Sequence, residues 1–317
     1  MPLTPTGELV ARTARGVGAF NVVLLEQLEA VLAGAARAGL PVIVQISENA
    51  VAYRGALGPL AAAAHAAIAD AGVPVALHLD HATDTDLVEE AVRLGFTSVM
   101  YDGSLLPWGE NLSRTREITR RCHDHGVWVE AELGAVGGKD RAEDGAGESA
   151  GESAGESAHT PGVRTDPAEA ARFVADTGVD ALAVAVGTAH RMTRRTAALD
   201  LALIAELHAA VPVPLVLHGS SGVDDRTLVA AVRAGMRKVN ISTHLNGVFT
   251  AEVRDRLAAR PGTVDPRRYL GPGRDAMAGE VARLLRLLAE EPEPDREQER
   301  EPEAEPDPEP EPKPAAS

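Results

Sequence analysis

Short apolar runs rich in β-branched residues alternate along the chain with longer stretches in which apolar residues recur every three or four positions. The run at 41–47, PVIVQIS, is typical of a buried strand. In the stretch before it, Leu28, Val31 and Leu32 lie at helical spacing, and Gly39 follows as a helix-ending glycine. The pattern recurs eight times. The predicted strands are 17–22, 41–47, 74–80, 97–102, 127–132, 181–187, 214–218 and 237–241.

Eight strand–helix units in about 260 residues predict an α/β fold in the form of a closed (β/α)₈ TIM barrel. The alternative is an open, doubly wound sheet that binds a dinucleotide. No Gly-x-Gly-x-x-Gly follows the first predicted strand, which disfavours that alternative. One more amphipathic helix is expected at about 273–289, so the barrel domain should occupy residues 1–289.

Two segments depart from this pattern. Residues 145–159 repeat the small, polar sequence Gly-Glu-Ser-Ala, which is typical of a flexible loop, so we expect a lid insertion at about 137–165. Residues 290–317 contain twelve acidic residues, three basic residues and eight prolines. Such a composition cannot bury apolar surface. We therefore expect a disordered acidic tail with no catalytic role.

Charge and cysteine content narrow the class of protein. The net charge is −16, but the acidic tail accounts for a large share of it, and the body has no basic stripe. Nucleic acid is therefore not expected as a partner. No apolar run approaches the ~20 residues that span a membrane, and the N-terminal sequence lacks the pattern of a signal peptide. With Cys122 as its single cysteine, the chain is expected to be cytoplasmic.

Chemically capable side chains gather at the predicted C-terminal strand ends, where barrel enzymes place their active sites. His81 follows the third strand, His190 the sixth, and His218 ends the seventh. Any one of them would suit a structural role, but three imidazoles around one mouth favour an open catalytic zinc site. The segments 219–222 and 240–243 follow strands seven and eight, where barrels often bind phosphate, although an ordinary Gly-Ser turn is the alternative for the first.

Other polar residues have simpler interpretations. His78 shares the inward face of the third strand with Asp80, and orienting Asp80 is its simplest role. His123 and His125 end a helix on the far side of the barrel, where a polar or cationic side chain suits the helix dipole.

These strand ends resemble those of the class II, metal-dependent ketose-bisphosphate aldolases, particularly the tagatose-bisphosphate aldolase-like branch. The resemblance covers residues 18–269, nearly the whole body. The motifs that carry it are AFNV at 19–22, LHLDH at 77–81, VEAELG at 129–134, AVAVGTAH at 183–190, LHGSSG at 217–222 and DPRRY at 265–269. The family fold is a (β/α)₈ barrel, in agreement with the independent count of elements.

The resemblance implies a catalytic Zn²⁺ held by His81, His190 and His218. It also implies that Asp102 and Glu132 can hold the metal in a second, more buried position, and that a monovalent cation can bind nearby. A metal with open coordination positions supplies the Lewis acid that the family's carbon–carbon cleavage requires.

Asp80 matches the family's acid/base at the C4 hydroxyl of the ketose. The residues implied in binding substrate or its phosphates are Asn21, Ser47, Arg191, Gly219, Ser220, Ser221, Asn240, Ile241, Ser242, Thr243 and Arg267. Arg267 resembles an arginine that reaches the active site of a neighbouring subunit, so a homodimer or homotetramer is expected.

The chain departs from the family pattern in and near the expected lid. The family has a catalytic Glu in this loop, after two glycines; here Asp140 stands at that place, while Glu143 has the wrong offset. The Gly-Glu-Ser-Ala repeat then lengthens the same loop. The family also has Gly after the second zinc histidine, where this chain has Arg191. These changes affect turnover and substrate choice rather than the metal ligands.

The implied reaction is the reversible cleavage of fructose or tagatose 1,6-bisphosphate into dihydroxyacetone phosphate and glyceraldehyde 3-phosphate. A related zinc-dependent lyase with a shifted sugar-phosphate substrate, and a sugar-phosphate-binding protein with little turnover, are the alternatives. A metal hydrolase with His-x-His on strand one is disfavoured because that strand has no histidine. A Schiff-base aldolase is disfavoured because Lys238 is expected near the start of strand eight, away from the mouth.

Overall fold

The computed structural model describes residues 3–11, 15–134, 164–190 and 192–290. Eight parallel strands close into a barrel in chain order, with the last strand paired to the first. The strands are β1 (Val17–Asn21), β2 (Val42–Ser47), β3 (Val75–Ala82), β4 (Ser98–Tyr101), β5 (Trp128–Leu133), β6 (Ala181–Val184), β7 (Leu215–Leu217) and β8 (Met236–Ile241). The predicted (β/α)₈ barrel is therefore confirmed. Most of the expected lid (137–163) and tail (291–317) lies outside the described residues.

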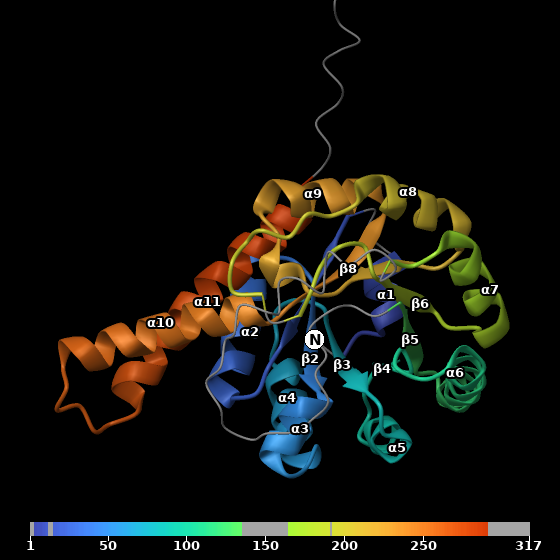
Figure 1. The fold of residues 1–317 in the computed structure, drawn as a ribbon. Helices are drawn as coiled ribbons and strands as arrows, with labels where there is room; N and C mark the ends of the chain where they lie inside the picture. Colours follow the sequence, from blue (N-terminus) through green and yellow to red (C-terminus); the bar gives the residue numbers. More distant parts are fainter. Residues whose placement is uncertain (1–2, 12–14, 135–163, 191, 291–317) are drawn as a thin grey trace, which may run out of the picture.

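Helices surround the barrel (Figure 1). Asp84, Asp166 and Asp224 cap three of them, because each side chain accepts a backbone N–H of the first turn. The helices are α1 (Thr6–Ala11), α2 (Leu25–Ala38), α3 (Glu48–Arg54), α4 (Gly58–Ala69), α5 (Thr85–Arg93), α6 (Trp108–His123), α7 (Pro167–Thr177), α8 (Leu201–Ala210), α9 (Asp225–Ala234), α10 (Thr243–Ala259) and α11 (Arg267–Leu288), with a short 3₁₀ helix, η3 (Ser220–Gly222).

The extra C-terminal helix, α11, is longer than expected, since it begins at Arg267 and passes through Pro272. Its first turns pair with α10, and the tip of this pair points away from the barrel (Figure 1). Its later turns pack on α2 at Gly34, where an added Cβ would lie 2.6 Å from Cβ of Val281. Only a glycine allows the two helices to approach so closely.

The barrel interior is layered. At the N-terminal end, Leu9 and Val10 of α1 pack against inward residues of the strands, including Val17, Ala19 and Ile43. Toward the C-terminal end the inward positions become polar and stay buried: Gln45, His78, Asp80, Glu130, Glu132, Lys238 and Asn240. An apolar plug at one end thus supports a polar layer below the mouth, where barrel enzymes do their chemistry.

Candidate active site

Two consecutive residues of β3 face the mouth of the barrel. In a regular strand, Asp80 and His81 would point to opposite faces. The register of β3 against β4 shifts between Leu79 and Ala82, and His81 has a backbone φ of 50°. Non-glycine residues rarely adopt this left-handed conformation, and those that do are concentrated at functional sites. The irregularity brings a carboxylate and an imidazole from neighbouring positions into one site.

The three histidines predicted as metal ligands come together at this mouth. The ring centroids of His81 and His218 are 4.5 Å apart, those of His81 and His190 4.9 Å, and those of His190 and His218 5.7 Å. Glu132 joins them, since one donor atom from each of the four residues lies within 4.8 Å of the others. His190 comes from the segment after β6, and His218 directly follows β7.

This donor set fits a divalent metal. Three imidazoles leave coordination positions open for substrate, as catalytic zinc requires. Nδ1 of His81 lies 2.8 Å from Oδ2 of Asp102, and Nε2 of His218 lies 2.8 Å from Oε1 of Glu130. Carboxylates behind imidazoles are a regular feature of metal sites, where they orient the rings. The remaining nitrogens, Nε2 of His81 and Nδ1 of His218, face each other at 2.8 Å.

The charges around His81 are strongly coupled. Burial lowers the pKa of His81, but the carboxylate of Asp80 and the hydrogen bond to Asp102 outweigh burial and raise it to about 9. Burial raises the pKa of Asp80 in turn, yet the neighbouring His81, His218 and Lys238 hold it below its usual value. Asp80 is therefore a buried carboxylate that stays ionised, able to accept a proton.

Two amides hold the Asp80 carboxylate. Nδ2 of Asn21 donates to Oδ2 at 2.7 Å, and Nδ2 of Asn240 donates to Oδ1 at 3.3 Å. Gln45 fixes Asn21 in turn by donating to its Oδ1 at 3.1 Å. Asn21 and Asn240, both expected to bind substrate, thus also orient the residue expected to act as the acid/base.

The segments expected to bind phosphate lie side by side after β7 and β8. Gly219 has φ of 65°, and an added Cβ would lie 2.6 Å from the carbonyl oxygen of Ala189. Ser220 donates to the carbonyl of Asn240, and Ser221 accepts the backbone N–H of His244 at 3.1 Å. The Ile241 side chain is buried against the outer helices, whereas Ser242 and Thr243 begin α10. Backbone N–H groups and the Ser221 and Ser242–Thr243 hydroxyls remain as the groups suited to a phosphate.

Of the remaining predicted site residues, Ser47 lies beside Asp80 in the β2–β3 pairing, and the others lie on the surface or outside the described residues. Ser47 ends β2, and its Oγ caps α3 by accepting the backbone N–H of Ala50 at 3.2 Å. Arg267 begins α11 at the tip of the α10–α11 pair, where its side chain is 90 % exposed and ion-paired with Asp265. Asp140 and Arg191 lie outside the described residues.

Comparison with known proteins identifies the family. Residues 8–292 match the family described as fructose-bisphosphate aldolase class-II. The chain belongs to the class II fructose-bisphosphate aldolases. A fructose-bisphosphate aldolase of Geobacillus stearothermophilus is 36 % identical over 291 residues, which is 90 % of this chain and 96 % of the relative. The aldolase is thus a carbon–carbon lyase of a metal-dependent class, and the resemblance of its motifs to the class II aldolase family is confirmed.

Solved structures agree. The aldolase is similar to the YdjI aldolase of Escherichia coli K12, with a TM-score of 0.75, 26 % identity and coverage of 91 % of this chain and 97 % of that one. A putative fructose-1,6-bisphosphate aldolase from Coccidioides immitis has a TM-score of 0.75, 29 % identity and coverage of 90 % and 94 %.

Two interpretations of buried polar residues in this aldolase were wrong. Lys238 is not remote from the site: it is fully buried inside the barrel, with Nζ 2.8 Å from Oε2 of Glu130. The two-residue period of a strand puts it on the same face as Asn240, which was the signal available in the sequence. His78 pairs through Nδ1 with Oγ of Ser98 at 2.7 Å rather than with Asp80. Burial lowers its pKa well below the usual value, so it is neutral.

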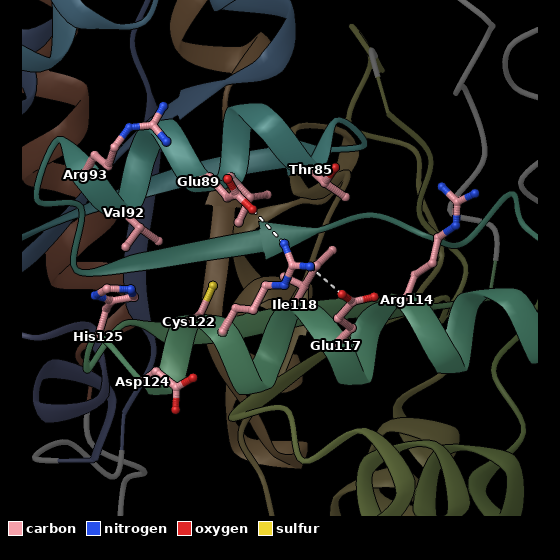
Figure 2. Close-up of a pocket in the computed structure, with 12 residues that line it drawn as sticks. Thr85, Glu89, Val92, Arg93, Arg114, Glu117, Ile118, Cys122, Asp124 and His125 are labelled. Atoms are coloured by element: carbon pink, nitrogen blue, oxygen red, sulfur yellow. Dashed lines mark hydrogen bonds and ion pairs between the residues drawn. The ribbon is translucent and has the colours of Figure 1, made fainter.

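A groove on the outer wall of the aldolase is separate from this site. It lies between α5 and α6 and has a volume of about 540 Å³ (Figure 2). Arg121 ion-pairs there with both Glu89 and Glu117 (Figure 2). Because Arg121, Glu89 and Glu117 are paired with one another, the groove gives less indication of a reactive site than the barrel mouth, where imidazoles and carboxylates come together.

No helix in the described part of the aldolase has the length and apolar character needed to cross a membrane.

Proposed function

We propose that this aldolase reversibly cleaves a ketose 1,6-bisphosphate, fructose or tagatose bisphosphate, into dihydroxyacetone phosphate and glyceraldehyde 3-phosphate, with zinc as its metal. The observation that carries the proposal is the convergence of His81, His190 and His218 beside the ionised carboxylate of Asp80. The relative named a fructose-bisphosphate aldolase supports fructose bisphosphate as the first substrate to test.

His81, His190 and His218 would hold the zinc, and Asp102 and Glu132 would hold it in a second position. When bound, the metal supplies Lewis-acid stabilisation of the negative charge left by carbon–carbon cleavage. Asp80 takes the proton of the C4 hydroxyl as the C3–C4 bond breaks. Its pKa, held below the usual value, keeps it unprotonated and ready to do so.

Asp140 would act as the second acid/base, exchanging the C3 proton of dihydroxyacetone phosphate. The segments after β7 and β8 would bind one phosphate through backbone N–H groups, and Ser47 would assist with the other. Two phosphates provide remote binding energy that orients the reacting carbons. A monovalent cation would bind near the same phosphate segments.

Arg267 would reach the site of a second copy of the chain, which makes the aldolase a homodimer or homotetramer. Its exposure at the tip of the α10–α11 pair supports this role. We place the enzyme in the cytoplasm, with the catalytic barrel at 1–289, the lid insertion at about 137–165 and the acidic tail at 290–317.

A second candidate is a zinc-dependent lyase with a shifted sugar-phosphate substrate. Arg191, in place of the glycine expected after His190, favours it because a guanidinium beside a phosphate loop changes which groups fit. Steady-state cleavage of fructose and tagatose bisphosphates, and of other ketose phosphates, distinguishes the two candidates by their kcat/KM values.

Removal of the metal tests the mechanism. We expect a chelator to abolish cleavage and stoichiometric Zn²⁺ to restore it. The matched protein is His65→Gln, which removes a histidine of α4 that bonds to the Leu94 carbonyl, outside the site, and should keep metal and activity. Full cleavage by a verified metal-free sample would overturn the proposal.

A further inference from the structure

Lys238 is a buried cation that no step of the proposed reaction uses. It sits on β8 with 0 % exposure, inside the barrel and below the histidines. A buried ammonium is costly unless it is paired. Its position in the interior of the active-site barrel therefore calls for a function beyond packing.

The partners of Lys238 lead to the metal site on one side. Nζ lies 2.8 Å from Oε2 of Glu130, and the other oxygen of Glu130 lies 2.8 Å from Nε2 of His218. With one oxygen engaged by the ammonium, the second is left as the acceptor for the ring. His218 must then carry its proton on Nε2 and present the lone pair of Nδ1, which faces His81 at 2.8 Å.

The same ammonium leads to the carboxylate on the other side. Nζ donates to Oδ1 of Asn240 at 2.8 Å. An ammonium has only donors, so it can contact only the oxygen of that amide, never its NH₂. The NH₂ group thereby faces two atoms, Oδ1 of Asp80 at 3.3 Å and Nε2 of His218 at 3.2 Å. Because Nε2 of His218 donates its own proton to Glu130, the Asp80 carboxylate is the acceptor left for this amide. One buried cation therefore determines which way both a histidine and an amide face.

We infer that Lys238 is a positioning residue of the aldolase, which selects the metal-binding nitrogen of His218 through Glu130 and the orientation of Asn240 toward Asp80. This inference rests on the proposed function for the roles of His218 and Asp80. Lys238 is not among the four residues whose donor atoms cluster at the mouth, so its effect would reach the reaction through Glu130, His218 and Asn240.

The test is Lys238→Met, which keeps a long side chain and removes the donors. Arg237→Met is the matched control, because it removes a cation from the adjacent position of β8, where Arg237 bonds outward to the Val232 carbonyl. The zinc-loaded full-length proteins are compared by zinc affinity in a chelator competition and by kcat and KM for fructose 1,6-bisphosphate. We expect Lys238→Met to bind zinc about 10- to 100-fold more weakly and to lose kcat by a similar factor, the usual effect of removing a group behind a metal ligand. KM should change far less, and Arg237→Met should match the parent in zinc affinity.

Lys238→Met leaves Glu130 as an unpaired buried charge, which can prevent folding. The double variant Lys238→Met/Glu130→Gln removes both charges and is measured in the same way. If either variant folds and keeps zinc affinity and kcat within twofold of the parent, the inference is overturned.

A measurement on the unaltered protein does not depend on folding of a variant. In the zinc-loaded chain with ¹⁵N-labelled histidine, the ring signals that disappear in His218→Gln report the His218 tautomer. A proton on Nε2 supports the inference, and a proton on Nδ1 overturns it. Zinc affinity and tautomer are independent of turnover, so an inactive parent would refute the proposed function without affecting this test.

Discussion

Replacement of Asp80 by Asn tests the assignment of the acid/base most directly. The side chain keeps its size, but its second oxygen becomes an NH₂ group. Nδ2 of Asn21 and Nδ2 of Asn240 now donate to the two oxygens, so one of them would meet a donor instead of an acceptor. A buried amide left without an acceptor costs about 1–3 kcal/mol of stability.

The expected loss of activity is larger. Removing a general acid/base lowers kcat about 10²- to 10⁴-fold, which corresponds to about 3–5 kcal/mol in the barrier. Metal content should stay near that of the parent, because Asp80 is not among the four residues whose donor atoms cluster. Loss of the Asp80 carboxylate should also lower the pKa of His81 from about 9, so a proton competes less strongly with the metal for the His81 ring.

The assay combines steady-state cleavage, metal analysis and urea unfolding on the same preparations. Asp84→Asn is the matched control, since Asp84 caps α5 three residues after His81 and asparagine caps helices equally well. Asp80→Asn with kcat within threefold of the parent, or with its metal lost while Asp84→Asn keeps it, would refute the assignment.

Three further predictions follow from particular contacts. Burial would raise the pKa of Glu280, but hydrogen bonds from Arg283 and His244 lower it to about 2. Its contribution is therefore complete above the usual value of 4.5 and is lost as pH falls toward 2. For a fully buried carboxylate, this lowering of the pKa would correspond to about 3 kcal/mol of stability. Glu280 is partly exposed, and solvent screening reduces its contribution to roughly 1 kcal/mol. Urea unfolding of Glu280→Gln should show that loss at pH 6 and a smaller one at pH 3; an equal loss at both would contradict this. In thermal unfolding, Gly34→Ala should lower the free energy of unfolding by about 1–2 kcal/mol, because the added methyl group pushes α11 away from α2. Gly279→Ala has open space around it and should stabilise the protein. Similar changes in the two variants would count against the packing argument. Asp140→Ala should slow exchange of the C3 proton of dihydroxyacetone phosphate by roughly 10²-fold, more than Glu143→Ala, while Asp140→Glu should be tolerated. The reverse order would assign the proton transfer to Glu143.

The sequence predicted the barrel closely because its strands are buried on both faces and appear as nearly continuous apolar runs. The deviations have local causes. β3 continues to Ala82, beyond the expected residue 80, because of its register shift. β6 ends at Val184, before the expected residue 187. The chain leaves the sheet after Val184, and Gly187 then adopts φ of 111°. Such backbone irregularities depend on tertiary contacts that periodicity does not encode.

The candidate site was predictable where side chains stand at strand ends, and less so one layer below. His81 was expected at the mouth and lies there, but within β3 rather than after it, and its inward orientation requires a left-handed backbone that the sequence pattern does not indicate. Glu130 and Lys238 lie deeper: Glu130 had no predicted role, and Lys238 was expected away from the mouth. Their pairing joins β5 to β8, a contact between strands that only barrel closure and its register bring about.

The charges inside the barrel explain why a dication belongs there. Asp80, Glu130 and Glu132 are buried, and Asp102 stands beside them behind His81. Lys238 offsets one of these carboxylates. In the metal-free protein, His81 responds by holding a proton, with a pKa of about 9. A divalent metal bound to the His81 ring would supply more positive charge than the proton and would have to displace it. Metal binding should therefore release protons and strengthen as pH rises toward 9, because the carboxylates that stabilise the proton on His81 would also stabilise a metal ion in its place.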